Sequence, residues 1–234
     1  MTVAGPVVTA VAEQPVAAIE AHSLYRFFRA GEEETLALQG VSLRLDRGEF
    51  VALVGPSGSG KSTLLSCLAG TDEPDGGTVR IDDVRLSHQP EPVRARMRGR
   101  NVGLLFQSSN LLAHLSVQQN VVLAQRLARP AKVASAASVL DSLGIATRAD
   151  AYPSQLSGGE LARAGLAVAL ANDPTVLLAD EPTGELDHAT ERAVLDQLRV
   201  RAATGVAVLV ASHSPAVATA ADRVVHIVDG RVVA

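Results

Sequence analysis

Several features are scarce in this sequence, and each shortage narrows the class of protein. There is one cysteine, Cys67, so an internal disulfide is impossible, which fits a reducing compartment. No stretch of about 18 residues is uninterruptedly apolar, so we expect no membrane span. The net charge of −4 comes without a basic excess, which argues against binding to nucleic acid. Cys67 lies in an apolar run with helical spacing, so we expect it to pack in the core.

The first residues carry no targeting features. No basic residue precedes Val7 and Val8, and Glu13 interrupts the apolar stretch, so we expect no signal peptide and a soluble, cytoplasmic protein. Residues 1–16 are small, apolar and punctuated by proline, and we expect a flexible tail. Hydrophobic residues make up 47% of the chain and charged residues 20%, so residues 17–234 can form one globular domain with its own core.

Short apolar segments alternate with glycine-rich and charged ones along this domain. The pattern predicts antiparallel strands over 18–24 and 36–45, joined by a charged loop at 31–34. Further strands are expected at 50–54, 78–81, 103–106, 176–179, 206–211, 224–228 and 231–233, the last two flanking an Asp-Gly turn. Helical segments are expected at 61–68, within 88–100, within 110–143 with a break at Pro130, at 189–202 and at 215–220. Strands that alternate with helices indicate a largely parallel α/β sheet.

One glycine-rich segment matches the phosphate-loop pattern G-x-x-x-x-G-K-[ST]. Glycines let the backbone curl, so that its N–H groups and a helix N-terminus face phosphate oxygens. Lys61 is one of only two lysines among 21 basic residues; it would reach the β- and γ-phosphates, while the Ser62 hydroxyl would ligate Mg²⁺. The predicted ATP-binding residues are Gly55, Pro56, Ser57, Gly58, Ser59, Gly60, Lys61, Ser62 and the following Thr63.

Two carboxylates follow a buried strand in the last third of the chain. Asp180 and Glu181 come directly after the apolar run 176–179. In α/β sheets, ligands bind beyond the carboxyl ends of the strands, so both side chains would face the phosphates. Asp180 would hold Mg²⁺ as a hard oxygen ligand, and Glu181 would act as the general base that activates the attacking water.

A second anion-binding pattern narrows the range of phosphate-loop proteins that this sequence can resemble. Leu156-Ser157-Gly158-Gly159-Glu160 resembles the LSGGQ signature of ABC ATPases, in a variant that ends in Glu. A serine hydroxyl and glycine N–H groups would face the anion at the start of a helix beginning near Glu160. Because the chain already holds a complete phosphate loop, this second site would cap the γ-phosphate of ATP bound to another subunit. The alternative is an ordinary helix N-cap at Ser157 without a ligand.

The resemblance to ABC ATPases extends over nearly the whole chain. It implies an α/β fold: a P-loop NTPase core of ABC ATPase type with an antiparallel β subdomain and a helical subdomain at about 88–165. Gln107 resembles the Q-loop residue that senses Mg²⁺ and the attacking water. Asp187, at the end of a segment similar to the D-loop, would lie at the dimer interface. His213 resembles the switch histidine that contacts the γ-phosphate.

An aromatic residue at the adenine end is also implied by the resemblance. Phe28 falls where the family usually places an aromatic ring that stacks on adenine. The nearby Tyr25 and Phe27 are expected in the core, although a shift of one position would exchange these roles.

Within the family, residues 106–112 with 117–121, and residues 178–187, resemble the group of lipoprotein-releasing ATPases, macrolide-exporter ATPases and the cell-division protein FtsE. The resemblance implies ATP and Mg²⁺ as cofactors, and a second nucleotide-binding subunit in a homodimer. It further implies a permease with few membrane helices and a location at the cytoplasmic face of the membrane. An FtsE-like ATPase that signals without cargo is the alternative. The soluble ABC proteins of translation or DNA repair need a second cassette or a coiled-coil insertion, and neither is visible.

Three positions depart from the family pattern. Val168 stands where a second arginine is expected after the signature, and Gly165 inside a helix costs about 1 kcal/mol relative to alanine. Ser214 follows His213 where an acidic residue is common. None removes a catalytic group, but their expected effect is either weaker packing of the signature helix or slower turnover, and a cassette that does not hydrolyse ATP is a further alternative.

Other polar and apolar residues admit plain explanations. Five scattered histidines lack metal-ligand spacing and are expected to have surface or ordinary core positions: His22, His88, His114, His188 and His226. The alternating arginines from Arg94 to Arg100 would form a solvated helix face, pair with acidic groups or lie beside the permease. In the region 110–128, apolar side chains would belong either to a groove that receives the permease or to the subdomain core: Leu111, Leu112, Leu115 and Val117.

Overall fold

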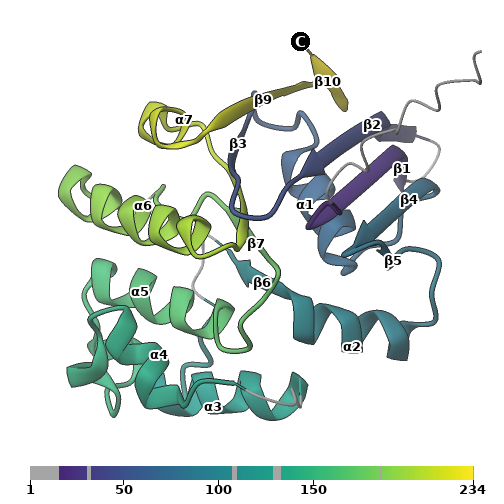
Figure 1. The fold of residues 1–234 in the computed structure, drawn as a ribbon. Helices are drawn as coiled ribbons and strands as arrows, with labels where there is room; N and C mark the ends of the chain where they lie inside the picture. Colours follow the sequence, from purple (N-terminus) through teal and green to yellow (C-terminus); the bar gives the residue numbers. More distant parts are fainter. Residues whose placement is uncertain (1–15, 31–32, 107–109, 129–132, 185, 234) are drawn as a thin grey trace, which may run out of the picture.

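The computed structural model describes residues 16–30, 33–106, 110–128, 133–184 and 186–233, which form two β-sheets and the helices packed against them (Figure 1). Most of the expected N-terminal tail lies outside these residues, and Val16, which is described, is exposed. In the described part of the chain, no helix is long and apolar enough to cross a membrane.

The first sheet is antiparallel and has four strands in the order β2-β1-β4-β5. Its strands are β1 (Ile19–Ala30), β2 (Glu33–Leu45), β4 (Gly76–Ile81) and β5 (Val84–Arg85). The strands β1 and β2 pair from Ile19 with Leu45 to Ala30 with Glu33. The charged loop expected at 31–34 is therefore wrong at its last two residues, which belong to β2. An ion pair of 3.1 Å between Arg29 and Glu34, which lie opposite each other, supports the longer ladder.

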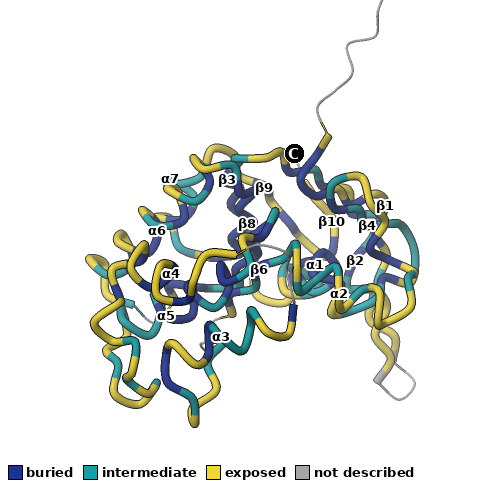
Figure 2. Tube along the Cα trace, turned by 60° about the horizontal axis from the view of Figure 1, so that its bottom comes forward, coloured by how far each residue is buried: buried dark blue, intermediate teal, exposed yellow. Residues whose placement is uncertain are grey.

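The second sheet has six strands in the order β10-β9-β3-β8-β7-β6. All neighbours pair in parallel except the terminal hairpin of β9 and β10, so the predicted largely parallel sheet is confirmed. Its strands are β3 (Phe50–Val54), β6 (Val102–Leu105), β7 (Val176–Asp180), β8 (Ala207–Ala211), β9 (Arg223–Val228) and β10 (Arg231–Val233). The strands β3, β7 and β8 are almost completely buried, and Figure 2 shows β3 and β8 in the middle of the molecule.

Two hydrophobic cores lie on the two faces of this sheet. Successive strand residues point to opposite faces, so Phe50 and Ala52 join one core and Val51 and Leu53 the other. The first core includes the helices α3 (Val117–Ala128), α4 (Ala136–Ser142), α5 (Gly158–Ala169) and α6 (His188–Ala203). The second lies between the two sheets, around α1 (Lys61–Ala69). Cys67 is buried there, as predicted, and burial raises the pKa of its thiol to about 12.

The remaining elements are short. The helices α2 (Glu91–Asn101) and α7 (Pro215–Ala220) and two 3₁₀ turns, Ala146–Arg148 and Pro153–Gln155, complete the described fold. Helix α2 has no buried residue and carries the alternating arginines. Arg94 forms ion pairs with Glu73 and Glu91, and Arg98 with Glu91, so these two arginines pair with acidic groups. The range 88–165 holds α2, α3 and α4 as well as β6, and the boundaries of the helical subdomain stay a prediction.

The unexpected glycine in the helix after the signature has a packing reason. A Cβ atom on Gly165 would lie 3.1 Å from a methyl group of Leu105, and one on Gly103 would lie 2.5 Å from the carbonyl oxygen of Ala169. Helix α5 therefore crosses β6 so closely that both elements have glycine at the crossing. This contact offsets the helix propensity that Gly165 loses.

Candidate functional site

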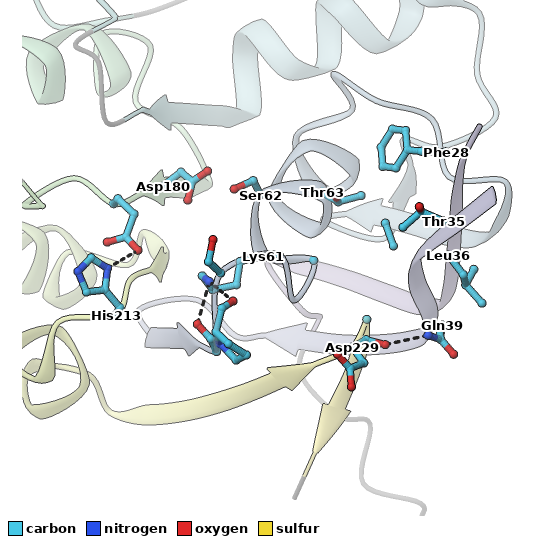
Figure 3. Close-up of a pocket in the computed structure, with 18 residues that line it drawn as sticks. Phe28, Thr35, Leu36, Gln39, Lys61, Ser62, Thr63, Asp180, His213 and Asp229 are labelled. Atoms are coloured by element: carbon cyan, nitrogen blue, oxygen red, sulfur yellow. Dashed lines mark hydrogen bonds and ion pairs between the residues drawn. The ribbon is translucent and has the colours of Figure 1, made fainter. Parts of the chain in front are cut away.

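A cavity of about 730 Å³ opens at the carboxyl ends of β3 and β7 (Figure 3). This is the edge of a parallel sheet at which ligands bind in α/β proteins. The cavity has contributions from both sheets, and most of the residues predicted from the motifs line it. The lining residues are Phe28, Thr35, Leu36, Ala37, Gln39, Gly55, Pro56, Ser57, Gly58, Gly60, Lys61, Ser62, Thr63, Asp180, Glu181, His213, Asp229 and Gly230.

The phosphate loop links β3 to α1, and glycine is required at its bends. Gly58 and Gly60 have φ of 76° and 103°, values that residues with a side chain rarely adopt. A Cβ atom on Gly55 would lie 2.1 Å from the carbonyl oxygen of Ile227 in β9. Helix α1 has no side-chain cap and no acidic residue in its first turn. Its first N–H groups are therefore free to bind an anion.

Lys61 lies across the loop. Its ammonium donates hydrogen bonds to the carbonyl oxygens of Gly55 and Pro56, both at 2.9 Å (Figure 3). These bonds hold the ammonium group of Lys61 beside the loop and the first N–H groups of α1. Ser59, although part of the motif, does not line the cavity: it is 3% exposed, and among the described residues its hydroxyl has no hydrogen-bond partner.

The general-base candidate, Glu181, is held by the strand beside it. Its backbone has φ of 47°, and its N–H donates to the carbonyl oxygen of Ala211 in β8. One carboxylate oxygen accepts a hydrogen bond of 2.9 Å from the Ser212 hydroxyl, and the other lies 2.8 Å from Nδ1 of His213. Two of the three side chains predicted to act in catalysis are therefore direct partners, and the dashed line at His213 in Figure 3 marks this contact.

The residues predicted to hold Mg²⁺ fit such an ion. Ser62 and Asp180 face each other across the cavity (Figure 3), and both offer the hard oxygen atoms that Mg²⁺ prefers. Among the described residues, neither side chain has a hydrogen bond or ion pair that would have to break. Gln107, predicted to sense the metal, lies outside the described residues.

At the other end of the cavity, Phe28 presents one face of its ring. The Arg26 guanidinium lies over the ring, 4.8 Å from its centroid, and is fixed by a two-pronged ion pair with Asp72. The expectation that Tyr25 and Phe27 belong to the core is wrong: they are 42% and 37% exposed. The strand β1 pairs with β4 only as far as Tyr25, whose partner is Gly76, so among the described residues this end of the strand has no neighbouring strand on that side and its aromatic residues partly face solvent.

Six lining residues could not be found from a motif. Four of them lie on β2: Thr35, Leu36, Ala37 and Gln39. The other two, Asp229 and Gly230, form the turn of the terminal hairpin, which contacts β2. The side-chain amide of Gln39 donates a hydrogen bond of 2.8 Å to the carbonyl oxygen of Asp229, and the backbone N–H of Gln39 donates one of 2.8 Å to the carbonyl oxygen of Gly230. These contacts join residues that are about 190 positions apart in the sequence, so no local sequence motif could predict them.

The signature residues do not line this cavity. Helix α5 begins at Gly158, two residues before the expected start, because Ser157 is its N-cap. The Ser157 hydroxyl accepts from the Glu160 N–H, and the Glu160 carboxylate accepts from the Ser157 N–H at 2.8 Å, which is a capping box. Glu160 also pairs with Arg148 at 2.7 Å. The Arg148 guanidinium, and next the Ser157 N–H, lower the pKa of Glu160 to about 2.

The signature lies instead beside the N-terminus of α6. Asp187 caps that helix and accepts hydrogen bonds from the backbone N–H groups of Ala189 and Thr190, both at 3.0 Å. The Thr190 hydroxyl also donates to Asp187, and these bonds lower the pKa of the carboxyl. A Cβ atom on Gly159 would lie 2.7 Å from a methyl group of Thr190, so only glycine lets the two helix starts approach this closely. Asp187 and the signature therefore form one surface, apart from the cavity.

The other predicted residues behave as ordinary surface or core groups. All five scattered histidines are exposed, and the described residues contain no cluster of metal-ligating side chains. In the region 110–128, the apolar side chains divide between the core and the surface. Val117 is fully buried, Leu111 packs against the core, and Leu112 is 45% exposed.

Comparison with known proteins gives the family. The family model described as "ABC transporter" matches residues 38–184. The lipoprotein-releasing system ATP-binding protein LolD 1 of Rhodospirillum rubrum is 41% identical over 227 residues, which cover 94% of this chain and 99% of that protein. The macrolide export ATP-binding/permease protein MacB of the same organism is 42% identical over 226 residues, or 95% of this chain. The chain spans only 35% of the length of that MacB.

Solved structures agree with the fold class predicted from the sequence. The dimeric structure of MJ0796, a bacterial ABC transporter cassette, has a TM-score of 0.84 and 33% identity, covering 92% of this chain and 96% of that one. A dimeric post-hydrolysis state of MJ0796 bound to ADP and Pi also has a TM-score of 0.84, with 32% identity and the same coverage. The chain therefore belongs to the ABC transporter family, as one of its P-loop cassettes that bind and hydrolyse ATP.

Proposed function

We propose that two copies of this chain close on two ATP molecules, and that this closure drives a membrane permease of the macrolide-export or lipoprotein-release type. The observation that carries the proposal is the division of the site. The cavity holds the phosphate loop, the acidic pair and His213, whereas the signature lies on a separate surface with Asp187. A second copy supplies the missing half through its own Ser157, Gly158 and Gly159.

The residues of the cavity hold the nucleotide. Adenine stacks on the open face of Phe28, and the phosphates lie over the loop and the first turn of α1. Lys61 exchanges the carbonyl oxygens of Gly55 and Pro56 for the β- and γ-phosphates. The oxygen atoms of Ser62 and Asp180 hold Mg²⁺, which neutralises phosphate charge when bound.

Hydrolysis follows from the pairing of Glu181 and His213. In the structure His213 holds one oxygen of the Glu181 carboxylate. When the γ-phosphate occupies the cavity, the exposed imidazole turns to it, and the freed carboxylate oxygen accepts the proton of the attacking water. The Ser212 hydroxyl keeps the other carboxylate oxygen in place throughout. Gln107 is proposed to orient the water and Mg²⁺.

Replacing Glu181 by Gln tests these roles. The amide keeps the size of the side chain but accepts no proton, so we expect ATP to bind and dimers to accumulate while hydrolysis falls by at least 100-fold. Light scattering after size exclusion gives the dimer fraction, and phosphate release gives the rate. Hydrolysis at the wild-type rate would contradict the role of Glu181.

The permease is proposed to dock at the start of α3. A groove of about 540 Å³ lies there, lined by Leu115, Ser116, Gln118, Gln119, Val122, Leu123, Arg126 and Asp150. It combines apolar side chains with one basic residue, Arg126, and one acidic residue, Asp150, which suits a short amphipathic helix. The protein would then lie at the cytoplasmic face of the membrane without a span in its described residues.

Affinity purification from detergent-solubilised host membranes tests this coupling. The Glu181→Gln protein with ATP is the bait, and mass spectrometry identifies what it retains. We expect a permease with a large extracytoplasmic domain, lost when Leu123 in the groove is replaced by Arg. The matched control is Leu127→Arg on the same helix, where Leu127 is 77% exposed and outside the groove. Recovery of a cell-wall hydrolase system without a transport pathway would favour the FtsE-like signalling role.

A further inference from the structure

A buried carboxylate lies behind the candidate site, and none of the roles proposed above uses it. Glu191 is in the first turn of α6 and is only 8% exposed. One of its carboxylate oxygens accepts hydrogen bonds from two hydroxyls, that of Ser214 at 2.7 Å and that of Thr183 at 3.2 Å. The other oxygen lies 3.7 Å from Nδ1 of His188. Burial of a carboxylate is unfavourable unless hydrogen-bond partners satisfy it, so a structural or functional role should explain why Glu191 is buried.

The two hydroxyls come from the two loops that carry the reactive side chains. Thr183 follows Glu181 by two residues, on the loop after β7. Ser214 follows His213 directly, on the loop after β8. From a third element, α6, Glu191 therefore ties the two loops together behind the cavity.

A second link closes the arrangement into a ring. The Ser212 hydroxyl donates to the Glu181 carboxylate at 2.9 Å and accepts from the Ser214 N–H at 3.1 Å. The hydrogen bonds run from Glu181 through Ser212 and Ser214 to Glu191, and return through Thr183 to the Glu181 loop. Three of the seven buried polar side chains among the described residues belong to this ring, so it is the main polar feature of the interior.

We propose that Glu191 is a positioning residue, which fixes the separation of the Glu181 and His213 loops. It thereby fixes the geometry in which His213 leaves Glu181 for the γ-phosphate and the freed Glu181 oxygen accepts the proton of the attacking water. The proposal rests on the proposed roles of Glu181 and His213. Glu191 touches neither of them and lines no part of the cavity, so it acts on turnover and not on ATP binding. A misplacement of reacting groups by about 1 Å lowers the rate by about 100-fold.

The substitution Glu191→Leu removes both acceptors while keeping an apolar side chain of similar size. We expect kcat to fall by about 30- to 100-fold with KM for ATP changed less than about threefold, because ground-state binding is intact. Glu191→Gln keeps an oxygen that accepts from both hydroxyls and should recover kcat to within about threefold of wild type. The control is Asp196→Ala, an exposed carboxylate on the same helix, which should leave kcat unchanged.

A double-mutant cycle separates positioning from a general loss of structure. If Glu191 acts through Ser214, the pair Glu191→Leu with Ser214→Ala should be no slower than Glu191→Leu alone. Should Glu191→Leu fail to fold by circular dichroism, Ser214→Ala and Thr183→Val remove the hydrogen bonds of Glu191 one hydroxyl at a time and should each lower kcat at constant KM. Ser214→Ala also removes the N-cap hydrogen bond of α7 from Ala216 N–H, so Thr183→Val is the cleaner of the two variants.

Two results would overturn the proposal. The first is a wild-type kcat in a folded Glu191→Leu protein, or in both Ser214→Ala and Thr183→Val. The second is a double variant whose loss of kcat equals the product of the losses in Glu191→Leu and Ser214→Ala. Failure of the proposed function is a separate result, because it is read from Glu181→Gln alone. If that variant hydrolyses ATP at the wild-type rate, the role of the base is wrong whatever Glu191 does.

Discussion

Glycine at position 55 is the most restrictive requirement of the phosphate loop. A Cβ atom there would lie 2.1 Å from the Ile227 carbonyl oxygen and 2.8 Å from the Ser59 hydroxyl. Real Cβ atoms keep at least 3.0 Å, so Gly55→Ala falls about 0.9 Å short of the space it needs. The obstructing carbonyl belongs to the backbone of β9, so no side-chain rotation relieves the clash.

The displacement that Gly55→Ala forces on the loop should lower both the stability of the fold and the rate of catalysis. Overpacking of this kind costs about 1–3 kcal/mol of folding free energy. A loop displaced by about 1 Å misplaces the phosphates and should lower kcat/KM for ATP by about 100-fold, equivalent to about 2.7 kcal/mol of transition-state stabilisation. Phosphate release measured against ATP concentration gives kcat/KM, and urea unfolding gives the stability.

A glycine away from the site is the matched control. Gly144 has φ of 63°, and a Cβ atom there would meet nothing within 4 Å. Gly144→Ala should therefore cost about 1–2 kcal/mol through backbone strain alone and leave kcat/KM unchanged. The reasoning is refuted if Gly55→Ala retains kcat/KM within threefold of wild type.

Three further predictions concern packing and protonation. Gly103→Ala places a Cβ atom 2.5 Å from the Ala169 carbonyl oxygen and should lower the free energy of unfolding by about 1–3 kcal/mol in urea; an unchanged midpoint would count against the close crossing of α5 and β6. Glu160, with its pKa lowered to about 2, stabilises the fold above its ordinary pKa of 4.5 and loses this contribution as pH falls toward 2. Arg148→Gln should raise that pKa in an NMR titration, and a value still near 2 would contradict the assigned cause. Cys67, whose pKa burial raises to about 12, should react with thiol reagents at pH 8 only after denaturation, and fast labelling of the native protein would contradict its buried position.

The sequence predicts the parts of the site that lie in contiguous motifs. The phosphate loop and the pair Asp180 and Glu181 follow apolar strands directly, so a local pattern places them at one sheet edge. The predicted start of α5 lies two residues too late, because Ser157 and Glu160 form a capping box that begins the helix at Gly158. The spacing of this serine and glutamate is that of a capping box, and the side-chain contacts show that it forms.

Contacts between distant residues account for what the sequence did not predict. The turn at Asp229 and Gly230 reaches Gln39 on β2 and thereby closes one wall of the cavity. Neither segment carries a motif, and each reads as an ordinary strand or hairpin. Glu191 likewise looks like an acidic residue in a first helical turn until Thr183 and Ser214 are seen beside it.

Complementation between two inactive variants tests most directly the claim that two copies share each site. Lys61→Ala disables the phosphate loop, and Ser157→Arg blocks the signature, so neither protein alone should hydrolyse ATP. In a mixed dimer one site combines the intact loop of one chain with the intact signature of the other. Because random pairing makes half of the dimers mixed, the rate should recover to about a quarter of the wild-type rate. A mixture no more active than the sum of the two folded variants would contradict the shared site.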